Sequence, residues 1–394
     1  MSIFKLKSTI RINCARRSNI YLKKEVEELG YKIDAEGDAS VEITGTLADC
    51  MKLNLYLRTA YRVLFLIDTF EAENPDLLYD HLVSIPWEEY IEPTGYISIS
   101  SFIENDYIKD TRFGNLKVKD AIVDRMQEKT GKRPDSGPDT DKMVLYLYWK
   151  NSDAAIFIDT SGDTIAKHNY RNFSVKAPMQ EALAAAVILA TRWDCKSAFI
   201  NTMCGSGTLA IEAALLASNK APGLMRHNFG FSHIKGYDDT IWKDLRLEAA
   251  RKTSRTLSFP IIASDNDPRA LSAARENAKS ARVDHLIRFE LCDFEETPIP
   301  DTNKGVVILN PEYGERMGEE EILEETYGFI GDFFKKKCKG YTGYIFTGNM
   351  DLAKKVGLKA KRRIEFYNAK IDCRLLEYEL YEGTRVVGKE EKII

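Results

Sequence analysis

Hydrophobic and polar positions change their period about two-fifths of the way along the chain. Up to about residue 165, short apolar segments of strand type and helix type follow one another, whereas beyond about 175 apolar strands alternate with longer helices. Strict strand–helix alternation is typical of a doubly wound parallel sheet, and mixed short elements are typical of α+β domains. The pattern therefore predicts an α/β protein with an N-terminal α+β region and a C-terminal Rossmann-like sheet.

The N-terminal part contains apolar segments of both periods. Alternation along the chain predicts strands, and a spacing of three to four residues predicts helices. We expect strands over 9–12, 41–43, 96–100, 144–148 and 154–158, and helices over 20–29 and 118–126. A further apolar stretch spans 51–66. The last two strands follow a turn-rich segment, and we expect them to pair as an antiparallel hairpin.

Five apolar segments of the C-terminal part predict the parallel strands of one sheet. They cover 197–201, 260–264, 287–291, 306–310 and 343–347, and a closing antiparallel pair is expected at 364–367 and 375–380. Asp267 and Pro268 supply an N-cap and a first-turn proline for a helix after the second strand. Acidic residues at 319–321 and lysines at 335–337 predict a helix after the fourth strand, because this order of charges complements the helix dipole.

The first of these strands runs into a glycine turn that is typical of a ligand-binding loop. The loop contains Asn201, Thr202, Cys204, Gly205, Ser206 and Gly207, and an apolar helix follows it. Glycine allows a ligand to approach the backbone, and the start of a helix offers unpaired N–H groups. The residues from Gly205 onward also satisfy the G-x-G-x-x-A pattern of nicotinamide and flavin sites, and a tight turn without a ligand is another alternative.

Acidic residues follow the next two strands. Asp265 and Asn266 end the second strand, and Asp293 and Phe294 end the third. A carboxylate at this edge can accept hydrogen bonds from ribose hydroxyls or from an adenine amine, with Phe294 covering the ring. A dinucleotide site places its acid about 20 residues after the glycines, whereas Asp265 lies about 60 residues beyond Gly205, so the spacing disfavours NAD. Either acid could instead be a helix cap or a solvated loop charge.

The fourth strand ends in Asn310, Pro311, Glu312 and Tyr313. An aromatic amine is a poor nucleophile because its lone pair is delocalised into the ring. The side-chain oxygen of Asn310 and the carbonyl of Pro311 can accept both amine hydrogens and direct that lone pair toward a methyl carbon, while Tyr313 stacks on the base. An Asn-Pro turn after a buried strand is the structural alternative.

Together these motifs resemble those of the THUMP-domain-containing bacterial 23S rRNA guanine-N2 methyltransferases. Residues 310–316 resemble that family's N-P-P-Y-G-E-R motif, residues 204–208 resemble its D-P-x-C-G-S-G-T loop, and 159–162 and 221–226 are similar to other stretches of the family. The resemblance covers nearly the whole chain. It departs at Asn201 and Thr202, which stand in place of Asp-Pro, and at Glu312, which stands in place of the second proline.

The resemblance implies a ferredoxin-like region at 1–65, a THUMP RNA-binding domain at 66–165 and a methyltransferase domain at 166–394. It also implies S-adenosylmethionine as the cofactor, large-subunit rRNA as the partner and guanine N2 as the methyl acceptor. Two other functions stay open. A DNA adenine-N6 methyltransferase would use the same geometry on another planar amine, and an RNA-binding or ribosome-assembly factor with impaired catalysis would explain the departures.

The charge of the chain restricts where RNA could bind. The net charge of −4 argues against attraction of RNA to the whole surface, so an RNA site must be a local patch. Two basic clusters are candidates, Arg11, Arg16, Arg17, Lys23 and Lys24, and Lys354, Lys355, Lys359, Lys361, Arg362 and Arg363. A run of charges is more often a solvated face than a binding site.

The sequence carries no pattern typical of a metal site, a membrane span or a secretion signal. Seven cysteines and five histidines are scattered without a metal-ligand spacing, so we expect neither a metal nor a disulfide framework. The sequence lacks an apolar run of the length that a membrane span or a signal peptide requires, which predicts a cytoplasmic protein.

Overall fold

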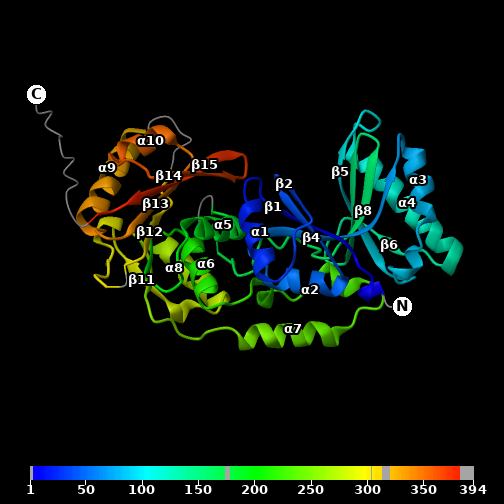
Figure 1. The fold of residues 1–394 in the computed structure, drawn as a ribbon, viewed down its shortest axis with the longest axis horizontal. Helices are drawn as coiled ribbons and strands as arrows, with labels where there is room; N and C mark the ends of the chain where they lie inside the picture. Colours follow the sequence, from blue (N-terminus) through cyan, green and yellow to red (C-terminus); the bar gives the residue numbers. More distant parts are fainter. Residues whose placement is uncertain (1–2, 174–177, 303, 313–319, 382–394) are drawn as a thin grey trace, which may run out of the picture. The chain divides into compact units, whose positions relative to one another are not determined.

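The computed structural model describes residues 3–173, 178–302, 304–312 and 320–381. The chain forms two compact units (Figure 1). Unit 1 comprises residues 1–169 and 220–253, and unit 2 comprises residues 170–219 and 254–394. The predicted change of pattern near residue 170 therefore coincides with a change of unit, but the chain returns to unit 1 once before the end.

Unit 1 is built on an eight-stranded sheet of strand order β2-β3-β1-β4-β8-β7-β5-β6. Its strands are β1 (Ser8–Cys14), β2 (Ala35–Gly37), β3 (Ser40–Gly45), β4 (Ala60–Glu71), β5 (Tyr96–Glu104), β6 (Asp135–Ser136), β7 (Met143–Lys150) and β8 (Asp153–Asp159). Its first helical segments are η1 (Ile3–Lys5), α1 (Asn19–Glu28), α2 (Leu47–Tyr56), α3 (Pro75–Ser84), η2 (Trp87–Glu89) and α4 (Thr111–Thr130). The expected hairpin is confirmed, because β7 and β8 pair antiparallel.

Alternation along the strands explains how this sheet meets its core. In β1, Ile10 and Ile12 are fully buried, whereas Arg11 between them is partly exposed and bonds Glu42 of β3. The buried side chains share one hydrophobic core with Leu22 and Val26 of α1. Buried residues two apart in the strand and four apart in the helix each form one apolar face, and the two faces pack together, as the sequence predicts.

Residues 220–253 pack in the core of unit 1, although the sequence places them between two strands of the C-terminal sheet. The segment contains η3 (Pro222–Met225), η4 (Gly230–His233) and α7 (Asp239–Arg251). Phe229, Phe231 and Trp242 are buried in the same core as β1 and α1. Trp242 meets the two phenylalanine rings edge-on at 5.1 and 4.9 Å between centroids. The sequence-based division at 165/166 assigned this segment to the methyltransferase domain.

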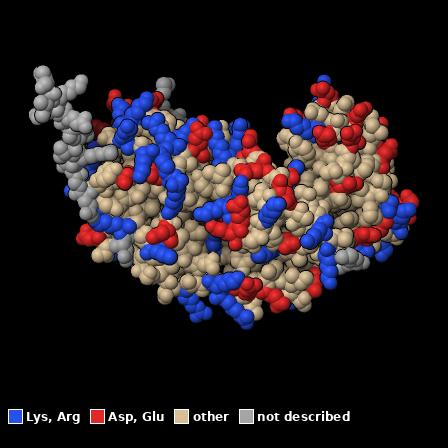
Figure 2. Space-filling model, in the orientation of Figure 1, with Lys and Arg blue, Asp and Glu red and all other residues tan. Residues whose placement is uncertain are grey.

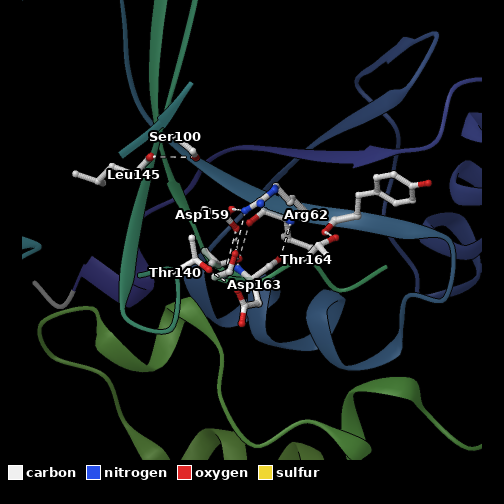
Figure 3. A network of polar contacts seen from close by, with 12 residues as sticks. Arg62, Ser100, Thr140, Leu145, Asp159, Asp163 and Thr164 are labelled. Carbon is white, nitrogen blue, oxygen red and sulfur yellow. Dashed lines mark hydrogen bonds and ion pairs between the residues drawn. The ribbon is translucent and has the colours of Figure 1, made fainter. Parts of the chain in front are cut away.

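A buried polar network fixes the turn after β8 (Figure 3). Arg62 of β4 donates to Asp159 and to the carbonyl of Gly162, and Asp159 accepts from the backbone N–H of Ser161 at 3.0 Å. The Arg226 guanidinium donates to the carbonyls of residues 161, 163 and 164. The two stretches that the family resemblance marks, 159–162 and 221–226, therefore contact each other and hold the returning segment on unit 1.

Unit 2 contains a seven-stranded sheet of order β11-β10-β9-β12-β13-β15-β14. Its strands are β9 (Phe199–Thr202), β10 (Ile261–Asp265), β11 (Ile287–Leu291), β12 (Val306–Leu309), β13 (Thr342–Thr347), β14 (Arg362–Asn368) and β15 (Ile371–Glu379). Its helical segments are α5 (Glu181–Thr191), α6 (Thr208–Ala217), α8 (Pro268–Ser280), η5 (Asp284–Leu286), η6 (Phe294–Glu296), α9 (Glu320–Lys337) and α10 (Met350–Lys355). The first five strands pair in parallel, and β15 pairs antiparallel with both of its neighbours. This is the predicted Rossmann-like sheet with its closing antiparallel pair.

Within the described ranges, no helix combines the length and the apolar character that crossing a bilayer requires.

Candidate active site

The predicted site residues that the structure describes lie at the carboxyl edge of the unit 2 sheet. β9 pairs with β10 on one side and with β12 on the other, and Thr202 at its end is level with Ser264 and Leu309. The strand order changes direction at β9, and open α/β sheets bind their ligands at such a switch point. The ends of β9, β10 and β12, where the sequence predicts the chemistry, are therefore neighbours along one edge.

The glycine loop after β9 has an unusual backbone. Met203, Gly205 and Gly207 all have positive φ values, of 52°, 55° and 82°. A left-handed conformation is unfavourable for a residue such as Met203 and is concentrated at functional sites. A side chain at Gly207 would place its Cβ 2.8 Å from the Cβ of Ala274 in α8, so glycine is required here by packing as well as by φ.

Buried side chains complete the loop. Cys204 and Ser206 are less than a tenth exposed. Burial raises the pKa of the Cys204 thiol far above its usual range, so the sulfur is a neutral packing group and not a nucleophile. The Cys204 N–H donates to the carbonyl of Ser264, which ties the loop to β10.

Asp265 joins the glycine loop to the end of β10. One carboxylate oxygen accepts from the Gly205 N–H at 2.8 Å, and the other accepts from the Asp267 N–H at 3.0 Å. Each oxygen of a carboxylate can accept two hydrogen bonds, so both have a further position available. Asp265 is thus placed to organise the loop and to accept from a ligand at the same time.

Three buried polar atoms at this edge have no partner among the described residues. They are the side-chain oxygens of Asn201, Thr202 and Asn310. The Asn201 amide nitrogen donates to the carbonyl of Ile308 in β12 at 3.3 Å, which orients its oxygen. Buried polar atoms are nearly always hydrogen-bonded in native proteins, so three such atoms together call for a polar ligand. The Asn-Thr pair that replaces the family's Asp-Pro contributes two of them.

The third strand end has a structural role that the sequence left open. Asp293 is the N-cap of η6 and accepts from the Glu295 N–H at 3.0 Å. Phe294 is 8% exposed and packs edge-on against Phe333 in the core, with ring centroids 5.8 Å apart. Asn266 is exposed at the end of β10. Contacts of these three residues with a cofactor stay predictions.

The fourth strand end is described as far as Glu312. Pro311 is buried and Glu312 is exposed. The carboxylate that departs from the family motif is therefore directed to solvent and leaves the buried Asn310 oxygen in place. Tyr313, the predicted stacking residue, lies outside the described residues, as does the remainder of the motif up to Arg316.

Three stretches of the chain match known families. Residues 168–377 match a family described as "RMKL-like, methyltransferase domain", and this match covers more than half of the chain. This chain belongs to the RMKL-like methyltransferase family. Residues 10–64 match an "RlmL ferredoxin-like domain" and residues 72–159 match a "THUMP domain". The predicted fold class of the RMKL-like chain, a ferredoxin-like and THUMP region before a methyltransferase sheet, is confirmed.

Relatives of this RMKL-like methyltransferase differ in length. The ribosomal RNA large subunit methyltransferase K/L of Syntrophotalea carbinolica is 36% identical over 370 residues, which cover 92% of this chain and 52% of the relative. The Synechocystis RNA methyltransferase candidate slr0064 is 32% identical, with 93% of this chain and 95% of the relative covered. The structure of SMU.472, a methyltransferase candidate complexed with SAH (S-adenosylhomocysteine), has a TM-score of 0.86 and 26% identity and covers 96% of this chain and 100% of that chain. The chain spans about half the length of the K/L relative.

Sequence reasoning missed two polar residues beside the glycine loop of the RMKL-like domain, Asn277 and Arg171. Asn277 lies on α8, among the residues whose spacing predicts an apolar helix face, and is fully buried. A polar residue in such a face is a detectable signal, because its amide must find partners inside the protein. Arg171 follows a tyrosine in the sequence, without any pattern that predicts its contacts.

Ion pairs occupy most of the two basic clusters of the RMKL-like chain. In the N-terminal cluster, Arg11, Lys23 and Lys24 pair with Glu42, Glu36 and Glu28. In the C-terminal cluster, Lys354, Lys355, Lys361 and Arg362 pair with Asp351, Glu324, Glu379 and Glu377. Blue side chains gather over α10 and β14 in Figure 2. Of the six residues in that second cluster, the exposed Lys359 and Arg363 have no ion pair within the described part of the chain.

Groups of three or more His, Cys, Asp or Glu side chains with metal-binding geometry are absent from the described residues.

Proposed function

We propose that this chain is an S-adenosylmethionine-dependent RNA methyltransferase that methylates an exocyclic base amine, guanine N2 of large-subunit ribosomal RNA. The observation that carries the proposal is the Asn310 side-chain oxygen, which is buried at the switch point of the sheet without a partner among the described residues. An amine hydrogen of a flipped base would satisfy it. The proposal applies to the half of the K/L relative that the chain spans.

The residues at the carboxyl edge fit the proposed cofactor. Asp265 has an acceptor position available on each oxygen, which suits a pair of ribose hydroxyls. Asn201 and Thr202, one strand away, carry buried side-chain oxygens that have no partner in the described part of the chain, and these oxygens suit the amino group of the methionine part. When bound, S-adenosylmethionine supplies an electrophilic methyl group. The homologous SMU.472 structure holds SAH, which supports the same ligand here.

The chain's own residues would orient the acceptor amine. Asn310 and the Pro311 carbonyl would each accept one amine hydrogen, which directs the nitrogen lone pair away from both and toward the methyl group. Because both groups are fixed at the end of a buried strand, little reorganisation accompanies the reaction. Tyr313 would stack on the base. The amine proton that is lost on transfer can leave to water, so this arrangement needs no strong base.

RNA as the substrate is supported by the THUMP match in unit 1 and by the name of the K/L relatives. We assign RNA binding to unit 1 and propose that Lys359 and Arg363 on unit 2 add phosphate contacts, because these exposed cations have no carboxylate to displace within the described ranges.

A methyl-transfer assay tests the proposal. Purified protein is incubated with labelled S-adenosylmethionine and either large-subunit rRNA fragments or duplex DNA, and the modified nucleoside is identified by mass spectrometry. We expect N2-methylguanosine from rRNA. Transfer to DNA adenine alone would replace the RNA assignment, and SAH binding without transfer to either would favour a binding or assembly factor.

The role of Asn310 is tested separately with Asn310→Ala. We expect loss of methyl transfer with SAH affinity within a few fold of wild type, because the side chain is proposed to contact the amine. Asn349→Ala is the matched control, since Asn349 lies two residues after the neighbouring strand β13 but caps α10 by accepting from the Asp351 and Leu352 N–H groups. Unchanged turnover in Asn310→Ala would remove the assigned role.

A further inference from the structure

We propose that Asn277 and Arg171 are positioning residues that hold the glycine loop in its cofactor-binding shape by tying it to residues 170–173, the strap with which the chain enters unit 2. The inference rests on the proposed function, because the loop is taken to bind S-adenosylmethionine. The strap begins directly after the boundary between the units at 169/170.

Asn277 connects three separate segments of unit 2. Its side chain is fully buried. The amide nitrogen donates to the carbonyl of Ser206 in the glycine loop at 3.2 Å and to the carbonyl of Phe173 at 2.8 Å. The amide oxygen accepts from the N–H groups of Asn172 and Phe173 at 3.0 and 3.1 Å. One side chain of α8 thus bonds both the loop and the strap, and all four of its bonds reach distant parts of the chain.

Arg171 bonds the residue that follows Gly207 at the end of the glycine loop. Its guanidinium donates to the Thr208 hydroxyl at 3.0 Å and to the carbonyl of Met179, and it lies 3.5 Å from the carboxylate of Glu181. Thr208 is the first residue of α6 and is 5% exposed. The two side chains therefore bond the residues on either side of Gly207. Asn277 bonds Ser206, and Arg171 bonds Thr208.

The loop needs this support because its backbone is intrinsically unfavourable. Three of its five residues from 203 to 207 have positive φ, and such conformations persist only where the surroundings impose them. Gly207 also packs against Ala274, one helical turn before Asn277, so α8 contacts the loop through both residues. A loop that is already held in its bound shape binds tighter than one that must be ordered on binding.

If position 277 served only to pack α8, an asparagine would not be needed there. An apolar residue would suit the buried face of α8 that Ala270, Leu271, Ala274 and Ala278 form. A buried amide is favourable only when its donors and acceptors are satisfied. Here its satisfaction depends on the loop and strap alone, which links the packing of this helix to the shape of the ligand loop.

The test compares Asn277→Ala with Asn54→Ala. Asn54 is a matched control because it is 1% exposed and also bonds two distant groups through its amide, but in unit 1. It donates to the Cys50 carbonyl and the Thr160 hydroxyl and accepts from the Ser161 hydroxyl. SAH affinity is measured by calorimetric titration, at a temperature where circular dichroism shows each variant to be folded. We expect SAH to bind Asn277→Ala at least about tenfold more weakly and Asn54→Ala within twofold of wild type.

Asn277→Asp provides a second variant if the alanine variant does not fold. It keeps acceptors for the two strap N–H groups but turns a carboxylate oxygen toward the carbonyls of Ser206 and Phe173. The loop therefore loses its bond to residue 277, whereas the strap keeps two of its three bonds. We expect the same loss of affinity. In methyl-transfer kinetics both variants should raise KM for S-adenosylmethionine about tenfold and leave kcat at saturation within about threefold.

Each outcome is decisive. Affinity within twofold of wild type in the folded Asn277 variants, or an equal loss in Asn54→Ala, overturns the positioning role while leaving the proposed function intact. Wild-type protein that does not bind SAH overturns both. A fall in kcat with unchanged KM would also contradict the proposal, because it would place Asn277 in the chemical step.

Discussion

Trp242 offers the sharpest test of how the chain is divided, because it follows β9 and α6 in sequence yet packs in unit 1. Trp242 is 8% exposed and touches two phenylalanine rings. Replacing a buried tryptophan by alanine costs about 3–5 kcal/mol. Unit 1 contains about 200 residues, and for this size each kcal/mol shifts the unfolding midpoint by about 2–4 °C. Trp242→Ala should therefore lower the midpoint of unit 1 by roughly 6–20 °C.

Trp193 is the matched control in unit 2. It is 9% exposed and packs against Phe199 and Phe259 at centroid distances of 4.9 and 5.6 Å. The loss of free energy in Trp193→Ala should be similar, but it should fall on unit 2. The two variants should therefore lose a similar free energy of unfolding, but in different units.

Calorimetry and hydrogen exchange distinguish the two outcomes. SAH should raise the midpoint of unit 2, by an amount that corresponds to about 2.7 kcal/mol at one hundred times Kd, and this identifies its transition. Trp242→Ala should lower the other transition and speed amide exchange in β1 and β4, whereas Trp193→Ala should do so in β9 and β10. If Trp242→Ala instead destabilised β9 and β10 and spared β1 and β4, the assignment of 220–253 to unit 1 would be refuted.

Three further predictions concern unit 2. Asp265→Ala removes the acceptor for the Gly205 N–H and should weaken SAH binding by about ten- to a hundredfold, measured by titration, since hydrogen bonds to charged groups contribute about 1.5–3 kcal/mol; unchanged affinity would exclude its role. Gly207→Ala should destabilise the protein in urea by more than Gly236→Ala, because both have positive φ but only position 207 lacks space for a Cβ; equal losses would contradict this. Burial raises the pKa of Glu377, but hydrogen bonding led by Arg362 holds it below its usual range, so its contribution is present above about pH 4.3 and lost as the pH falls through the lower folded value. Glu377→Gln should therefore lower stability at pH 7 by about 1.5–3 kcal/mol and flatten the loss below pH 5 in thermal melts, and an unchanged acid slope would count against the pair.

The period of apolar residues was sufficient to place the unit 2 sheet. The strand expected over 287–291 coincides with β11. For the other expected strands of this sheet, most ends lie within two residues of the ends in the structure. Helix starts in this unit could also be predicted from cap residues. Asp267 accepts from the Arg269 N–H at the start of α8, as the sequence predicts. The stretch 51–66 was not divided because the end of α2 and the start of β4 are both apolar, with only three residues between them.

Long-range partners were the part that the sequence did not determine. The strand period indicates that Phe294 is apolar and near the site, but its contact with Phe333 depends on how α9 crosses the sheet. Asn277 is visible as a polar residue in an apolar face, yet its partners are 71 to 105 residues away. The aromatic residues of 220–253 indicate a buried segment without indicating which of two cores receives it.

The return of residues 220–253 to unit 1 has a consequence for synthesis. A ribosome that has completed β8 has not yet made Phe229, Phe231 or Trp242, and roughly ninety more residues must be added before the core of unit 1 is complete. At about 5–20 residues per second this takes about 5–18 s. During that interval the first part of unit 2 emerges beside an N-terminal sheet that still exposes apolar surface. Unit 1 therefore cannot complete its core until residues 170–219 of unit 2 have also been synthesised.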